Sequence, residues 1–207
     1  MRQALIRLQY LLLIMCMLSC RSSMIRYSWT HPENINSKYD KILVVAITNK
    51  EDSSFRRQTE DYMVQRLNGL GYSTVSSLKE FGIEGLAHMN DVETYIKLCN
   101  TGIDAVFSLV LIDKHKRRLH MQGNVAKFYY DRIWNYRNLV AMGSEMRGAE
   151  GTNQKIYYES MVFDLRTLQP TYFVQTKFFT SYLLSQCFPC YEDKILQHML
   201  GKKVFTK

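Results

Sequence analysis

Two cysteines near the carboxyl terminus, Cys187 and Cys190, have the C-x-x-C spacing that supports thiol–disulfide exchange. At the start of a helix this spacing lowers the pKa of the first thiol and makes it a better nucleophile. A thioredoxin-like site, however, needs the rest of that fold downstream, and only seventeen residues follow Cys190. We therefore expect a local disulfide or two unpaired thiols here rather than a catalytic pair.

Acidic side chains form two pairs that are close in sequence, and neither pair is placed for acid–base work. Glu60 and Asp61 are adjacent in a predicted helix, so their side chains diverge by about a third of a turn. Glu159 and Asp164 are five residues apart in a predicted strand, which puts them on opposite faces. The chain also lacks a phosphate-binding loop, a dinucleotide fingerprint and a nucleophile elbow. We therefore predict no catalytic residue, no cofactor and a protein that is not an enzyme.

The histidines do not form a ligand set either. His115 and His120 are five residues apart, which matches neither one helix face nor a usual zinc spacing. The basic run around them includes Lys116, Arg117 and Arg118. We interpret this run either as a solvated loop or as a contact for anionic lipid headgroups, to which each cation would add ~1 kcal/mol. No metal site is predicted.

An aromatic group follows in the same long segment, residues 114–154, which has no periodic pattern of its own. Its members are Phe128, Tyr129, Tyr130, Trp134 and Tyr136. A loop this long is uncommon in a compact domain unless it has a function or is mobile. Tyrosine and tryptophan are favoured in binding surfaces because they offer a broad contact area. The segment is therefore either a partner-binding surface or a satellite core packed against the domain.

The N-terminus has the three zones of an export signal. Two arginines precede an apolar run over residues 11–18, and the small residue Ser19 stands before Cys20. The run is too short to span a bilayer as a helix. The stretch from Met17 to Cys20 resembles the lipobox of bacterial lipoproteins, which implies removal of residues 1–19 and covalent attachment of diacylglycerol and an N-acyl chain to Cys20. The alternative is an ordinary signal peptide in which the cysteine is incidental.

Composition is typical of a single domain with a core of its own. Loss of residues 1–19 removes two arginines and no acidic group, so the formal charge falls from +8 to +6. Such a balance suits contact with an anionic membrane surface, and an exported protein has little access to nucleic acid. With Cys16 removed and Cys20 lipidated, Cys99, Cys187 and Cys190 remain, too few for a fold held by disulfides.

Residues 20–40 are predicted to be the lipidated N-terminus and a polar tether. Between Arg21 and Lys38 the chain is rich in serine and asparagine and shows no apolar period. Fully extended, these residues would reach up to ~60 Å. Within the tether, Trp29 is a candidate for packing back onto the domain.

Hydrophobic patterns in residues 41–207 predict a single layered α/β domain. The expected order is a strand at 41–48, a helix capped at 52–54, a strand at 72–78, a helix from about residue 90, and a strand at 104–112. This β-α-β-α-β order predicts parallel pairing. A β-hairpin with arms at 155–163 and 171–179 and a helix from about Pro189 to Leu200 complete a mixed sheet of about five strands.

The order of several short motifs resembles a family of uncharacterised lipoproteins found in Bacteroidetes-type genomes, of the DUF4136 type. The motifs are Ser28-Trp29 with Pro32, Lys41 to Ala46, Arg56-Arg57 with Glu60, Leu67, Gly71-Tyr72, Ser76-Ser77, Gly102 to Val106, Tyr158-Glu159, Phe163 to Leu165, and Val174 to Thr176. The resemblance covers nearly all of the mature chain. It implies a lipid-anchored envelope domain, with no catalytic residues to carry over.

The expected function is therefore a non-catalytic binding or assembly-accessory domain, anchored by lipid and contacting an envelope protein or polymer. Arg21 differs from the aspartate that retains enteric lipoproteins at the inner membrane, which favours the outer membrane and its periplasmic side. The alternative is an enzyme or small-molecule binder with a pocket at the carboxyl ends of the parallel strands, near Asn49, Ser76 or Asp113.

Overall fold

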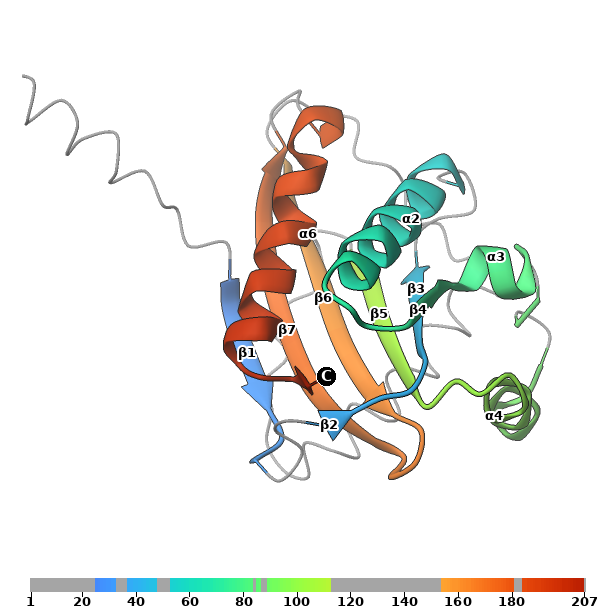
Figure 1. The fold of residues 1–207 in the computed structure, drawn as a ribbon. Helices are drawn as coiled ribbons and strands as arrows, with labels where there is room; N and C mark the ends of the chain where they lie inside the picture. Colours follow the sequence, from blue (N-terminus) through green and yellow to red (C-terminus); the bar gives the residue numbers. More distant parts are fainter. Residues whose placement is uncertain are drawn as a thin grey trace, which may run out of the picture.

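The computed structural model describes residues 25–32, 37–47, 53–83, 85–86, 89–112, 154–180 and 184–206. These residues form a mixed six-stranded sheet in the order β1-β7-β6-β5-β3-β4 and a separate two-stranded sheet, β2-β8 (Figure 1). The strands are β1 (Ile25–Thr30), β2 (Ser37–Lys38), β3 (Ile42–Ile47), β4 (Thr74–Ser76), β5 (Ala105–Ile112), β6 (Gln154–Asp164), β7 (Gln169–Thr180) and β8 (Phe205–Thr206). The helices are α2 (Ser53–Gly69), α3 (Ser77–Phe81), α4 (Asp91–Asn100) and α6 (Leu184–Gly201). The predicted α/β class is confirmed, with six strands in the main sheet rather than about five.

The parallel half of the sheet follows the sequence pattern. β3 is a continuous apolar strand, and β4 and β5 pair with it in parallel on its two sides. Helix α4 begins where its cap was predicted, because Asn90 accepts from Glu93 N at 2.9 Å and Glu93 Oε2 accepts from Asn90 N at 2.9 Å. Gly102, at φ 73°, provides the left-handed residue that follows the helix.

β4 is shorter than the predicted strand at 72–78 because a helix begins inside that range. The side chain of Ser76 accepts a hydrogen bond from Lys79 N at 3.3 Å and so caps α3. The chain therefore leaves the sheet after three strand residues. Because β4 ends early, a polar cluster forms at its carboxyl end.

The predicted hairpin is confirmed, and both arms run slightly longer than expected. β6 and β7 pair antiparallel from Gln154 opposite Thr180 to Asp164 opposite Gln169. In the turn, Asp164 Oδ1 accepts from Arg166 N at 2.8 Å, and Leu168 takes a positive φ of 56°. An aspartate that binds the backbone two residues ahead is a common turn-forming device.

Residues 25–30, expected in the polar tether, form the edge strand β1. It pairs antiparallel with β7, from Ile25 opposite Thr176 to Thr30 opposite Tyr172. The tether prediction was wrong here because the alternation of Ile25, Tyr27 and Trp29 with polar residues, a strand period, was hidden by its polar surroundings. Trp29 accordingly belongs to the sheet, and only residues 21–24 separate Cys20 from the first strand.

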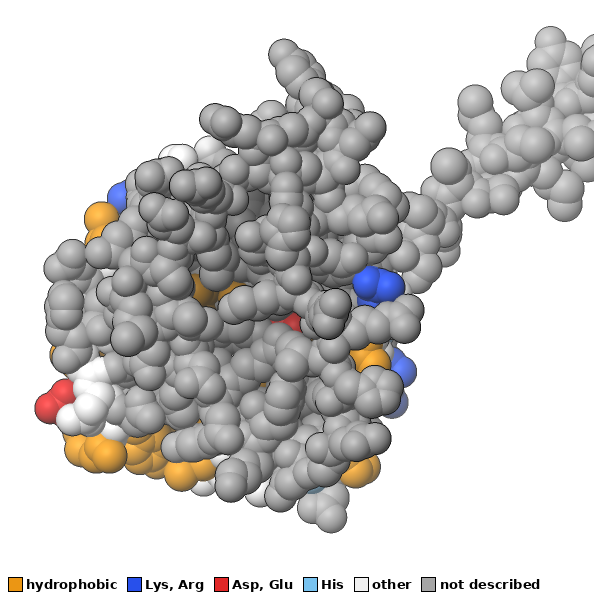
Figure 2. All heavy atoms as spheres, turned by 180° about the vertical axis from the view of Figure 1, so that it is seen from behind, with side chains coloured by type: hydrophobic (Ala, Val, Ile, Leu, Met, Phe, Trp, Pro, Cys, Tyr) orange, Lys and Arg blue, Asp and Glu red, His pale blue; other side chains and the backbone are white. Residues whose placement is uncertain are grey.

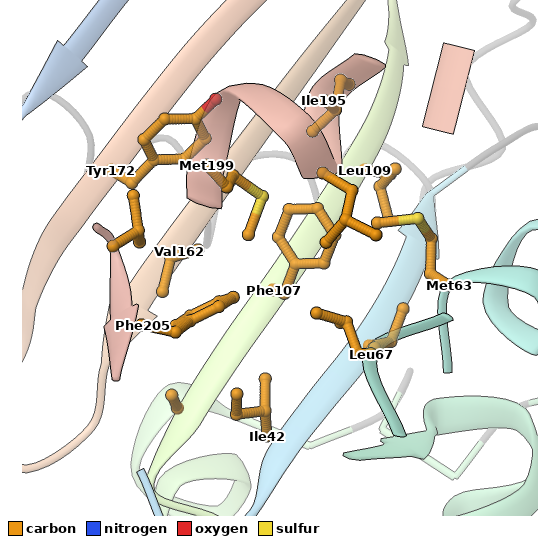
Figure 3. Close-up of a cluster of buried hydrophobic side chains, with 14 of the residues drawn as sticks. Ile42, Met63, Leu67, Phe107, Leu109, Val162, Tyr172, Ile195, Met199 and Phe205 are labelled. Carbon is orange, nitrogen blue, oxygen red and sulfur yellow. The ribbon is translucent and has the colours of Figure 1, made fainter. Parts of the chain in front are cut away.

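The larger core lies between one face of the sheet and the helices α2 and α6. Figure 3 shows Phe107 of β5 surrounded by side chains from both helices and from neighbouring strands. The labelled members besides Phe107 are Ile42, Met63, Leu67, Leu109, Val162, Tyr172, Ile195, Met199 and Phe205. All are buried, so this face supplies most of the described hydrophobic contact.

Helix α6 starts five residues before Pro189, where its beginning was predicted. The prediction treated Pro189 as a first-turn residue, the usual place for proline in a helix. Leu184 and Gln186, which are good helix formers, lie ahead of it inside the helix. The predicted start of the helix, at Pro189, was therefore more than one helical turn too late.

The other face of the sheet carries a smaller cluster beneath α3 and α4, made of Leu43, Leu98, Ile103, Phe163 and Leu165. The outer side of α4 leaves Val92 and Ile96 exposed. Figure 2, a view from behind, shows hydrophobic side chains gathered at the lower left, on the side of the molecule where α4 lies. Among the described residues, no helix is both long and apolar enough to cross a membrane.

Candidate functional site

A buried polar cluster fills the edge of the sheet where β3 and β4 end. At its centre is the carboxylate of Glu60, from α2, which has no exposed surface. Its two oxygens accept five hydrogen bonds of 2.6–3.2 Å, and the donors are Ala46 N, Arg56 Nε, Ser76 Oγ, Ser77 Oγ and Leu78 N. One side chain thus joins α2, β3, β4 and α3.

The donor from β3 is available because β4 ends early. The last residue that β3 shares with β4 is Val44, which pairs with Ser76. Two residues farther on, Ala46 N donates to Glu60 Oε1 at 3.0 Å. The carboxylate therefore takes the place of a missing strand neighbour, as buried backbone donors require a partner.

The remaining donors come from the turn between β4 and α3 and from the preceding helical turn. Ser76 Oγ donates to Glu60 Oε2 at 2.6 Å and Ser77 Oγ donates to Oε1 at 2.7 Å. Arg56, one turn before Glu60, donates from Nε to the carboxylate and from Nη2 to Ser77 Oγ at 3.1 Å. The guanidinium compensates the buried negative charge, which would otherwise be costly.

This geometry makes Glu60 a structural residue. A carboxylate offers about four lone-pair directions, and five donors already occupy those of Glu60. Both serine hydroxyls are buried and donate inward, so neither is presented to a substrate. The neighbouring Asp61 points elsewhere, to Lys79 Nζ at 2.8 Å, which confirms that the two adjacent acids diverge.

The second predicted acid pair is also separated. Glu159 lies opposite Val110 in the β5–β6 pairing and accepts from Gln175 Nε2 at 3.0 Å. Asp164, at the other end of β6, binds Arg166 Nη2 at 2.9 Å. An odd separation along a regular strand places the two carboxylates on opposite faces, as predicted.

Sequence reasoning missed a second buried carboxyl, Glu192 of α6. It has no exposed surface, and neither of its oxygens has a hydrogen-bond partner among the described residues. Burial, reinforced by the negative charge of Asp193, raises the pKa of Glu192 to about 8. At neutral pH this carboxyl is therefore protonated.

A signal for Glu192 is present in the sequence. Leu196 and Met199 follow it at i+4 and i+7, so the acid stands on the apolar stripe of the helix. The same helix carries His198, whose Nδ1 lies 2.7 Å from the hydroxyl of buried Tyr172. Burial lowers the pKa of His198, and the positive charge of Lys202 lowers it further.

Most of the residues singled out from the sequence lie outside the described part of the chain. These are Cys20, Lys116, Arg117, Arg118, Phe128, Tyr129, Tyr130, Trp134 and Tyr136, together with Asn49 and Asp113. For Cys187 and Cys190 only the backbone is described, and it lies in the first two turns of α6. In the described ranges, no three histidine, cysteine, aspartate or glutamate side chains gather as a metal site.

Replacing Glu60 with alanine tests the cluster. Because Glu60→Ala leaves buried donors and the Arg56 charge without a partner, we expect a loss of about 3–5 kcal/mol in the free energy of unfolding. Urea denaturation followed by circular dichroism measures it. Asp61→Ala is the matched control and should cost less than ~1 kcal/mol, since its ion pair with Lys79 is exposed. Equal losses in the two variants would contradict the structural role.

Replacing Glu192 with glutamine tests the buried carboxyl. The unfolded chain loses this proton near pH 4.5 and the folded protein near pH 8, so the wild type becomes less stable as the pH rises between these values. We expect Glu192→Gln to remove that loss and to exceed the wild type by on the order of 4 kcal/mol at pH 7.5, with a difference below ~0.5 kcal/mol at pH 4.5.

Denaturation curves at a series of pH values provide the measurement. Asp193→Asn, next in sequence and paired with Arg66 at the surface, should keep most of the wild-type slope. A wild type whose stability does not decline between pH 5 and pH 8 relative to Glu192→Gln would show that the carboxyl is ionised in the folded protein.

Comparison with known proteins gives likenesses of fold at low sequence identity. No family model and no curated protein match the chain. Among solved structures, a single-substitution variant of the PelC dodecamer from Paraburkholderia phytofirmans is 12% identical with a TM-score of 0.46, covering 82% of this chain and 93% of that one. A second PelC dodecamer structure from the same organism is 9% identical, with a TM-score of 0.45 and coverage of 87% and 97%. Lipoprotein GNA1162 from Neisseria meningitidis is 11% identical, with a TM-score of 0.43 and coverage of 78% and 97%.

Proposed function

We propose that this protein is a lipid-anchored lipoprotein of the bacterial cell envelope, whose domain binds an envelope protein or polymer without catalysing a reaction. Residues 1–19 would be removed as an export signal, and Cys20 would carry diacylglycerol and an N-acyl chain. Several acyl chains on one residue provide a stable membrane anchor, which a single chain does not. The proposed location is the periplasmic side of the outer membrane.

The observation that carries the proposal is the short distance in sequence between Cys20 and the folded domain. The sheet begins at Ile25, and β1 pairs with β7 over its whole length apart from one irregularity near its start. The apolar export segment and the folded chain therefore meet within a few residues of the cysteine. The proposed cleavage site lies ahead of the sheet, so removal of residues 1–19 would leave β1 and its pairing with β7 intact.

The non-catalytic part of the proposal is supported by the state of the described acid groups. Glu60 is saturated with donors, Glu192 is buried without a partner, and Asp164 is bound to Arg166. General acid–base catalysis requires a group within reach of a substrate. The alternative function, a pocket near Ser76, is disfavoured because the Ser76 hydroxyl is buried against Glu60.

Kinship with the DUF4136-type lipoproteins is part of the same proposal. Two of the motifs that carry the resemblance, Arg56-Arg57 with Glu60 and Ser76-Ser77, meet in the Glu60 cluster. They form one hydrogen-bonded unit although they are up to 21 residues apart in sequence. A shared structural requirement of this kind explains why such motifs would occur together.

The proposed binding surface is the aromatic and basic segment 114–150. It leaves the sheet after Ile112 of β5 and returns before Gln154 of β6, two strands that pair antiparallel. Its ends are therefore anchored side by side at the carboxyl edge of β5. Lys116, Arg117, Arg118, Phe128, Tyr129, Tyr130, Trp134 and Tyr136 are the candidate contacts.

Crosslinking in the native envelope, followed by purification and mass spectrometry, tests this function. We expect the wild type to be crosslinked reproducibly to one envelope component, and a variant lacking residues 127–137 to lose that crosslink while keeping its circular dichroism spectrum. Cys20→Ser is the control for anchoring and should leave the membrane fraction. A deletion that unfolds the domain would instead assign the segment to the core, and an unchanged crosslink would place the binding surface elsewhere.

A further inference from the structure

We propose that the carboxyl edge of the sheet, where β3, β5 and β7 end, is the surface that faces the lipid bilayer. This inference rests on the proposed lipidation of Cys20. It adds a defined orientation of the domain relative to the membrane. The partner is the headgroup layer of a phospholipid membrane.

The strand directions fix where the anchored end enters the fold. β1 runs antiparallel to β7: Ile25 lies opposite Thr176, four residues before the end of β7, and Thr30 lies opposite Tyr172, so β1 runs away from the carboxyl edge. β7 is antiparallel to β6, and β6 is antiparallel to β5, so β7 and β5 end at the same edge. β3 is parallel to β5 and ends there too. Figure 1 shows β1 beside the first part of β7, with its arrow directed away from the end of the sheet where α6 begins.

The short link limits how far this edge can move from the membrane. From Cys20 to Ile25 the chain spans five residue steps, or at most ~18 Å when fully extended. β7 alone contains 12 residues, which corresponds to a length of ~40 Å. Ile25 is level with a point four residues, or ~13 Å, from the carboxyl end of β7 and seven residues, or ~23 Å, from its other end. A link of at most ~18 Å can therefore reach past the carboxyl edge but not past the opposite edge, where the β6–β7 turn lies.

Electrostatics at the edge is compatible with an anionic lipid surface. α2 begins here and carries the exposed Arg57 in its first two turns, and Arg26 is exposed on β1. The N-terminal ends of α2 and α6 lie at this edge (Figure 1), so the positive ends of both helix dipoles are directed toward it. Cations near a bilayer are attracted to its negative surface potential.

Fluorescence energy transfer to a lipid-bound acceptor tests the orientation. The lipidated full-length protein, with Cys99, Cys187 and Cys190 replaced by serine, is reconstituted in vesicles of phosphatidylethanolamine and phosphatidylglycerol that contain a rhodamine lipid. The donor dye is attached through Ser54→Cys at the start of α2 or through Thr167→Cys in the β6–β7 turn, both at exposed positions. A second pair, Gln58→Cys and Lys202→Cys, replaces the first if labelling disturbs folding.

We expect energy transfer from residue 54 to be severalfold more efficient than from residue 167. Equal transfer from the two positions, or stronger transfer from residue 167, would overturn the orientation while leaving the anchor intact. The intact mass of the same preparation reports whether Cys20 is lipidated. An unmodified Cys20 would overturn the proposed anchor and the orientation with it.

Discussion

The carboxylate of Glu60 is the interaction on which the carboxyl edge of the sheet depends. A buried charge is tolerated only when it is paired and hydrogen-bonded, and Glu60 meets this condition with donors from four elements. It lets β4 stop after three residues, because the backbone donor of β3 that β4 no longer reaches is bound by the acid. It also positions the turn into α3 and fixes α2 against the sheet.

The Glu60 cluster, which fills the carboxyl ends of β3 and β4, also limits where a ligand could bind. In open α/β sheets, ligands usually bind beyond the carboxyl ends of the parallel strands. Here the ends of β3 and β4 are occupied by the protein's own side chains, with Ser76 and Ser77 directed inward. We therefore propose that the protein acts through its surfaces and through its position at a membrane. Two features lie toward the same edge of the sheet. The long segment between β5 and β6 starts there, and the short link from the proposed anchor at Cys20 enters β1 from that side.

Much of the fold could be predicted from the sequence because its local signals agree with the final packing. The apolar β3 and β5 segments, the Asn90–Glu93 capping box and the hairpin turn at Asp164 each have a local physical cause. The errors occurred where a local signal had two interpretations. Pro189 indicated a helix start although the helix begins at Leu184, and the alternation of β1 was hidden among serines and charged residues.

The candidate site was less predictable because its members become neighbours only through tertiary structure. Glu60 was considered with its sequence neighbour Asp61, whereas its real partners are Ser76 and Ser77, 16 and 17 residues away. Glu192 had a clearer signal, since it is an acid on the apolar stripe of α6. Its lack of a partner depends on the way α6 packs against the domain, and no local pattern encodes that arrangement.

Hydrogen–deuterium exchange of the lipidated protein tests whether the folded sheet begins within a few residues of the proposed anchor at Cys20. The measurement follows the backbone amides of Tyr27, Ser28 and Trp29 beside those of Phe173 and Val174 in β7. We expect every second amide of β1, those that point into the β1–β7 ladder, to be protected nearly as well as the amides of β7, because an edge strand is hydrogen-bonded on one side only. Complete exchange of residues 27–29 within seconds, with β7 protected, would mean that these residues are a flexible tether and would contradict the account.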